Sequence, residues 1–204
     1  MVGVTRRNFV FLLPTTLLAA CQTGRNPSRS MTDLKDISRI ETYLNDNAGI
    51  QGNFMQVWPD GKQSTGHLTY LPGQLRLDYD QPSRMVVVAK GKRMVAKDFG
   101  NQSVTHIGLA RNPLGLMLHR PVLLKEPIII TAIQRNTNSI QISLASADNP
   151  SQGLLTLSFY DVQGKLALYE LQAVDARNNH SQMHLYDIKP AGVVSENLFT
   201  YPDS

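Results

Sequence analysis

The first 21 residues hold the clearest chemical signature in the chain. The run Leu18–Cys21 (Leu-Ala-Ala-Cys) has the small residues and the cysteine of a bacterial lipobox, whose cysteine thiol receives a diacylglyceryl group. The twin arginines Arg6 and Arg7 and a short apolar stretch precede it, as in an export signal. That stretch is too short for a membrane-spanning helix, which needs about 20 apolar residues. We therefore expect residues 1–21 to be a signal peptide, with Cys21 either lipidated or lost with the signal.

The other groups that could do chemistry are scattered. His180 and His184 are four residues apart, which would pair them on a helix, but on a strand they lie about 13 Å apart, too far to share a metal. Asp78 and Asp80 share one face of an expected strand, and a solvated strand end explains them better than an acid–base pair does. The motifs of serine hydrolases, zinc peptidases and P-loop proteins are absent, and Cys21 is the only cysteine. We predict neither an enzyme nor a metal site, and no cofactor.

Basic residues are concentrated at the N-terminus. The formal charge is +4, and Arg6, Arg7, Arg25 and Arg29 lie in the first 30 residues, where there is no acidic residue. Residues 31–204 consequently carry equal numbers of basic and acidic groups. Because nucleic-acid binding depends on clustered lysine and arginine, this balance argues against a nucleic-acid partner. A hydrophobic content of 42% excludes a disordered chain, and we expect one monomeric domain.

Hydrophobic periodicity divides the rest of the chain into a tether, a helix and a sheet. Residues 22–32 are polar and typical of a tether, whereas 33–47 have apolar residues at helical spacing, with Thr32 as N-cap and Gly49 beyond the end. After Gly49 the period changes to two, and turn signals separate short strands. This pattern predicts either a barrel or a strongly curved half-barrel within residues 33–204. We expect strands over 51–58, 65–71, 74–79, 84–89, 93–98, 103–107, 128–134, 138–145, 153–160, 165–174 and 181–188.

One region, 107–127, is strongly apolar but is broken by prolines and a glycine, which predicts one or two short helices. These helices could cap the barrel or form a movable lid over an apolar cavity. Residues 85–89 and 154–157 are apolar on both strand faces and therefore need cover on both sides. A half-barrel lined in this way could bind acyl chains, because burying each CH₂ is worth about 0.8 kcal/mol. A helix that fills the interior completely is the alternative, and the residue pattern leaves both open.

The order of several loose motifs carries a family resemblance. Residues 52–56 (Gly-Asn-Phe-Met-Gln), the two strands within 66–82 and the Asn-Pro-Leu run at 112–114 resemble the periplasmic outer-membrane lipoprotein carrier family (LolA) in order and spacing. The similarity extends over residues 33–202. In that family an arginine stands where this chain has Leu71, and it hydrogen-bonds the lid; a tryptophan stands where this chain has Leu77. With Leu71, lid closure would depend on apolar contact.

The resemblance implies a non-enzymatic carrier with an incomplete antiparallel β-barrel of about eleven strands, an N-terminal helix and a short helical lid, in the α+β class but mainly β. Such a protein would take acylated lipoproteins from an inner-membrane lipoprotein-releasing transporter through the periplasm to an outer-membrane acceptor or membrane surface. The expected lining of the lipid-binding cavity is Phe54, Leu68, Tyr70, Leu75, Leu77, Tyr79, Val87, Leu155 and Leu157, with Leu114, Leu116, Met117 and Leu118 as the lid.

Three alternatives remain at this point. The lipobox is unusual for a soluble carrier and is more similar to the outer-membrane acceptor family (LolB), whose members would be anchored, here through Cys21 and to the outer membrane. A structural envelope lipoprotein would have a filled core and no ligand. A hydrolase would have a reactive serine.

Overall fold

The computed structural model describes residues 29–202, so the predicted signal peptide and Cys21 lie outside the described residues. The first element is the helix α1 (Met31–Leu44). Its N-cap is Ser30, whose hydroxyl accepts a hydrogen bond from the Asp33 backbone N–H at 3.1 Å, while the Asp33 carboxylate accepts one from the Ser30 N–H. This reciprocal capping box starts the helix earlier than predicted, so Met31 and Thr32 are helical and Thr32 is not the cap.

The C-terminus of α1 also differs from the prediction, because the helix ends at Leu44 and not at Asn47. The side chain of Asn45 bonds the backbone of Val122 twice, donating through Nδ2 and accepting through Oδ1, both at 2.8 Å. This contact with a distant segment fixes Asn45 outside helical geometry. A tertiary bond of this kind leaves no signal in the local sequence.

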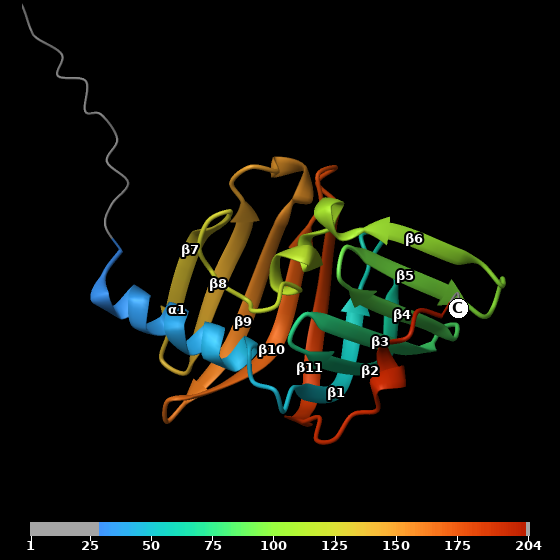
Figure 1. The fold of residues 1–204 in the computed structure, drawn as a ribbon, viewed down its shortest axis with the longest axis horizontal. Helices are drawn as coiled ribbons and strands as arrows, with labels where there is room; N and C mark the ends of the chain where they lie inside the picture. Colours follow the sequence, from blue (N-terminus) through green and yellow to red (C-terminus); the bar gives the residue numbers. More distant parts are fainter. Residues whose placement is uncertain (1–28, 203–204) are drawn as a thin grey trace, which may run out of the picture.

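A single antiparallel sheet contains all eleven strands of the part of the chain that the structure describes (Figure 1). Its order is β6-β5-β4-β3-β2-β1-β11-β10-β9-β8-β7, and β6 and β7 form the two edges without pairing with each other, so the barrel is incomplete, as the resemblance implied. Each predicted strand range coincides with an observed strand to within a few residues. The strands are β1 (Ile50–Val57), β2 (Gln63–Leu71), β3 (Gln74–Gln81), β4 (Met85–Lys90), β5 (Arg93–Asp98), β6 (Val104–Gly108), β7 (Ile128–Asn136), β8 (Ser139–Ser146), β9 (Leu154–Val162), β10 (Lys165–Val174) and β11 (His180–Pro190).

Short 3₁₀ helices occupy the region where the sequence predicted one or two short helices. Between β6 and β7 lie η1 (Leu109–Arg111) and η2 (Pro113–Met117), while η3 (Pro150–Gln152) precedes β9 and η4 (Glu196–Phe199) follows β11. The contacts of η2 are with β8, β9 and β10. The segment between the two sheet edges therefore lies over the inner face of the sheet.

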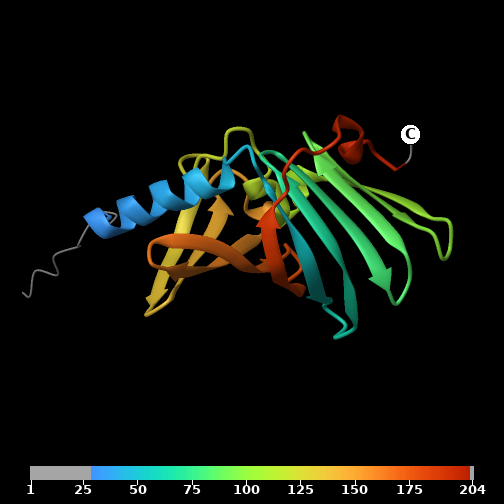
Figure 2. The ribbon, with the colours of Figure 1, turned by 90° about the horizontal axis from the view of Figure 1, so that it is seen from below.

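Helix α1 covers one half of that inner face, alongside β7–β10 (Figures 1 and 2). Its residues Ile37, Ile40 and Leu44 are buried in the main core. The ring of Tyr43 meets Phe159 of β9 edge-on, with centroids 5.4 Å apart, and its hydroxyl accepts a hydrogen bond from the Leu168 N–H at 3.1 Å. The helix thus fills the β7–β10 half of the sheet, reaches β2 only through the contact of its C-terminal end with Tyr70, and leaves the rest of the β1–β5 half to other residues.

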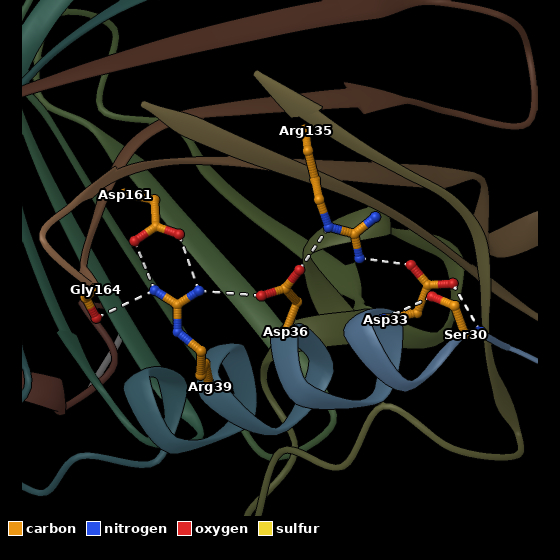
Figure 3. Close-up of polar contacts among 7 residues, drawn as sticks. All are labelled: Ser30, Asp33, Asp36, Arg39, Arg135, Asp161 and Gly164. Atoms are coloured by element: carbon orange, nitrogen blue, oxygen red, sulfur yellow. Dashed lines mark hydrogen bonds and ion pairs between the residues drawn. The ribbon is translucent and has the colours of Figure 1, made fainter. Parts of the chain in front are cut away.

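Two arginines fasten α1 to the sheet (Figure 3). Arg39 forms a bidentate pair with Asp161 at 2.6 and 2.9 Å and also donates to Asp36 at 3.0 Å. Arg135 at the end of β7 donates to Asp36 at 2.6 Å and to Asp33 at 2.5 Å. Asp36 accepts from both arginines, so one connected network joins the helix to β7 and to the end of β9.

This network predicts a specific acid sensitivity. Hydrogen bonds from Arg39 and from Arg135 lower the pKa of Asp161 and of Asp33, respectively, below the ordinary value of 3.8. A lowered folded-state pKa gives stability that is complete above the ordinary value and is lost as the pH falls below it. We therefore expect the double variant Arg39→Met/Arg135→Met to lose less stability than the unmodified chain between pH 7 and pH 3. Urea unfolding at both pH values measures this difference.

The matched control for this experiment is Arg84→Met, because Arg84 lies over the ring of Phe99 at 5.3 Å instead of beside these carboxylates. It should show the same acid loss as the unmodified chain. Equal acid losses in the control and the double variant would mean that the network contributes nothing to stability.

The C-terminal segment explains why β4 is apolar on both faces. Phe199 of η4 packs against Val86 and Val88, which face away from the main core. Arg76 donates to the Leu198 carbonyl at 2.9 Å and holds this segment on the sheet. Leu71 belongs to the same outer cluster, whereas residues 114–118 belong to the main core. The residue that replaces the family arginine therefore packs with the C-terminal segment and not with the expected lid.

Candidate functional site

The half of the inner face that α1 does not cover contains a cavity of about 280 Å³. A row of side chains in register forms its main wall: Leu68 lies opposite Leu77, Leu77 opposite Val87, and Val87 opposite Ala96. The row therefore crosses β2 to β5, and alternation directs all four side chains to the same face. Its opposite wall comes from the ends of β9–β11, through Leu155, Leu171, Ala173, Ser181 and Met183.

The structure brings most of the predicted cavity residues together. The predicted residues all lie in the main core, on the inner face, and differ in whether they border the open space. Those that border the cavity are Leu68, Leu75, Leu77, Tyr79, Val87 and Leu155. Phe54, Tyr70 and Leu157 are packed into the core and do not line it.

Tyr70 shows why a residue on the correct face can still be remote from the cavity. Its hydroxyl donates to the Leu44 carbonyl at the end of α1 at 2.9 Å. The tyrosine is therefore covered by the helix, and burial raises its pKa. Strand alternation predicts the face but not which part of it the helix covers.

The four predicted lid residues also differ in whether they border the cavity. Leu114 lines the cavity, together with Asn112 and Pro113. Leu116, Met117 and Leu118 are each at most 4% exposed and pack in the core.

Hydrogen bonds hold both ends of the 109–124 segment. On one side the Gln152 and Asn149 side chains donate to the Leu109 and Ala110 carbonyls, at 3.1 and 2.6 Å. On the other side the Glu41 carboxylate of α1 accepts from the Leu124 N–H at 2.6 Å. A Cβ at Gly115 would lie 2.3 Å from the Leu109 carbonyl oxygen, so the segment packs closely against itself. Between these two ends the segment borders the cavity through Asn112, Pro113 and Leu114.

Several lining residues were missing from the sequence prediction. Met85, Met94 and Met183 border the cavity, and their unbranched thioether side chains suit a lining that adapts to a flexible ligand. Gln56 and Trp58 also line it. The alternation of β1 contained the signal for Gln56, which lies two residues after Phe54 on the same face.

An aromatic cluster fixes the position of the Tyr79 side chain in the cavity wall. Phe54 meets Tyr79 edge-on at 4.9 Å, and Trp58 stacks on it at 5.9 Å. The Trp58 Nε1–H donates to the Ser64 hydroxyl at 2.9 Å, and the Tyr79 hydroxyl donates to Gln56 Oε1 at 2.5 Å. Burial raises the pKa of Tyr79, so its hydroxyl remains a donor at neutral pH. Trp58 is the only tryptophan of the chain and therefore reports on this cavity.

The lining becomes polar at Asn112, Asp175 and Asn179. The Asp175 carboxylate accepts hydrogen bonds from the Asn179 backbone and side chain, both at 2.9 Å, and these bonds lower the pKa of Asp175. A charged carboxylate and two amides therefore border a cavity whose interior is mostly apolar. Such a lining suits a ligand with a long apolar part and a polar end.

The other candidate groups have ordinary structural partners. Asp78 forms a bidentate pair with Arg76, with contacts of 2.7 and 2.8 Å, and Asp80 lies 3.6 Å from His67. His184 lies 3.1 Å from Glu170. Residues 29–202 contain no cluster of three metal-ligating side chains, and no helix among them is long and apolar enough to cross a membrane.

A family model for the outer membrane lipoprotein carrier protein LolA matches residues 45–202, which include the sheet, the cavity and the 109–124 segment. This chain belongs to the LolA family. The family consists of periplasmic carriers that bind lipoproteins, and not of enzymes. Membership in the LolA family therefore indicates a carrier-type protein, and the apolar cavity agrees with this.

Three solved structures are similar to this LolA-family chain. A LolA superfamily protein from Nitrosomonas europaea is 9% identical, with a TM-score of 0.48 over 84% of this chain and 98% of that chain. An uncharacterized conserved protein from Thermus thermophilus is 11% identical, with a TM-score of 0.48 over 84% and 94%. A DUF1329 family protein from Desulfovibrio piger is 8% identical, with a TM-score of 0.44 over 84% and 98%. No curated protein sequence matches this chain.

Proposed function

We propose that this protein binds the acyl chains of bacterial lipoproteins in the cavity beside α1 and carries them from the inner to the outer membrane. The observation that supports this most directly is the unequal filling of the inner face. The helix covers the β7–β10 half, while the β1–β5 half retains a cavity of about 280 Å³ with apolar walls. Each CH₂ of a bound chain would contribute about 0.8 kcal/mol, so no charged contact is needed.

Loading of a whole lipoprotein would require the 109–124 segment to move. The cavity is slightly smaller than the range of about 300–1,000 Å³ for small-molecule sites, whereas lipoproteins carry several long chains. Displacing Leu114 and the buried Leu116, Met117 and Leu118 would extend the cavity towards Leu157 and the other core residues of the inner face. In this proposal the 109–124 segment is the lid. It opens at the inner-membrane releasing transporter for loading and again at the outer-membrane acceptor or membrane surface for release.

A second candidate function is supported by the lipobox. A LolB-like acceptor would have the same sheet and cavity but would remain anchored to the outer membrane through Cys21. Labelling cells with an alkyne fatty acid separates the two: we expect an anchored protein to incorporate label and Cys21→Ser to lose it. A mature chain without label would be a soluble periplasmic carrier.

The proposed function is tested by purifying the full chain from the periplasm and identifying co-purifying molecules by mass spectrometry. We expect acylated lipoproteins or their lipids at near-stoichiometric amounts. Recovery of no acylated molecule, together with no binding of a hydrophobic dye, would contradict the carrier and favour a structural lipoprotein. Labelling by a serine-reactive phosphonate would instead favour a hydrolase.

A further inference from the structure

Inside the apolar cavity lies a polar side chain with an unused donor. Gln56 lines the cavity and is only 8% exposed. Its Oε1 accepts the hydrogen bond from the Tyr79 hydroxyl, and no hydrogen bond from its Nε2 is found among residues 29–202. No fully buried side-chain nitrogen or oxygen in this part of the chain lacks a partner, so the Gln56 NH₂ is reached from the open space of the cavity. A hydrocarbon chain that covered this donor without accepting a hydrogen bond from it would leave the amide unsatisfied, at a cost of about 1–3 kcal/mol.

The amide of Gln56 is oriented before any ligand binds. Tyr79 is held between the rings of Phe54 and Trp58, at 4.9 and 5.9 Å, and Trp58 is itself fixed by its bond to Ser64. Because the Tyr79 hydroxyl occupies Oε1, the side-chain NH₂ is the end of the amide that is left for a ligand. A donor fixed in this way can discriminate between ligands, since its orientation costs no further side-chain entropy on binding.

We propose that Gln56 Nε2 donates to the carbonyl oxygen of an acyl ester, so that the cavity selects O-acylated lipids over chains that lack the carbonyl. This inference rests on the proposed function, because it assumes that an acyl chain occupies the cavity. The chain beyond the carbonyl lies along the row of Leu68, Leu77 and Val87, and the polar part of the ligand lies at Asn112 and Asp175.

The chemistry of the cavity favours an ester over the other carbonyl-containing lipids. An ester carbonyl accepts a hydrogen bond and brings no donor of its own. A free fatty acid would bring a carboxylate, whose charge would be desolvated in the cavity and repelled by Asp175 at the polar end of the lining. An acyl amide would bring an N–H that needs an acceptor in the apolar wall. The diacylglyceryl group of a lipoprotein contains two such esters.

The test compares two ligands that differ only at the carbonyl. A lysophospholipid with a palmitoyl ester and its hexadecyl ether analogue, both below their micellar concentrations, are titrated into the full chain while Trp58 fluorescence is recorded. One neutral hydrogen bond corresponds to a preference of about fivefold for the ester. Gln56→Leu should remove this preference, so that the ester and the ether bind this variant with equal affinity. The same-strand control Gln51→Leu, at a position that does not line the cavity, should keep the preference.

The outcomes separate this inference from the proposed function. Equal binding of ester and ether by the unmodified chain would overturn the role of Gln56 and leave the carrier intact. Binding of neither lipid would overturn both. Because Gln56→Leu leaves the Tyr79 hydroxyl without its acceptor, Gln56→Leu/Tyr79→Phe is the second variant. An ester preference that persists in the double variant would mean that another group donates the hydrogen bond to the ester carbonyl.

Discussion

Replacement of Ala96 by phenylalanine should block acyl binding and leave the protein folded. Ala96 is the smallest side chain in the row that continues from Leu68 through Leu77 and Val87, and it borders the cavity. A phenyl ring there would occupy much of the 280 Å³ that a chain would otherwise enter. We expect affinity for acyl ligands to fall by roughly tenfold or more, because the lost apolar burial exceeds about 1.4 kcal/mol.

Trp58 fluorescence provides the measurement, since a brominated acyl chain bound in the cavity would quench it. The matched control is Ala145→Phe on β8, at a position that alternates with the buried Leu144 and pairs with the exposed Ile129. That variant should bind as the unmodified chain does. Unchanged quenching in Ala96→Phe, with normal unfolding by urea, would show that the acyl chain lies elsewhere.

Much of this fold could be predicted from the sequence because strand alternation and turn residues are local signals. β5 (Arg93–Asp98) and β10 (Lys165–Val174) begin and end where the pattern placed them. The ends of α1 could not be predicted, because one depends on the Ser30–Asp33 capping box and the other on Asn45 bonding Val122 far along the chain. Local patterns therefore predict where an element lies. They do not reveal the tertiary contacts that set its ends.

The sequence predicted on which face of the sheet the candidate site lies, but not which residues of that face line the cavity. Alternation placed Leu77 and Val87 on the inner side of the sheet together with Tyr70, but only the structure shows that α1 covers Tyr70. Gln56 lies on that face too, two residues after Phe54, but it was not among the predicted lining residues. The double-sided apolar character of residues 85–89 correctly indicated a second cover, which proved to be the C-terminal segment at Phe199.

The division of the inner face into a filled and a hollow half leads to a second large effect. Phe159 is fully buried beneath α1, contacts Tyr43 edge-on at 5.4 Å and does not line the cavity. Truncation of a buried phenylalanine costs about 3–5 kcal/mol, because the space it leaves is not refilled. We expect Phe159→Ala to lower the free energy of unfolding by this amount.

Acyl binding by the molecules of Phe159→Ala that remain folded should be close to normal, because Leu68, Leu77 and Val87 are untouched. Urea unfolding gives the stability, and titration well below the unfolding midpoint gives the affinity. The neighbouring Tyr160, 53% exposed and stacked on Tyr169, provides the control: Tyr160→Ala should cost no more than about 1.5 kcal/mol. If Phe159→Ala instead weakened acyl binding as much as Ala96→Phe, then α1 and the cavity would form one unit, and the helix would have to move with the lid during loading.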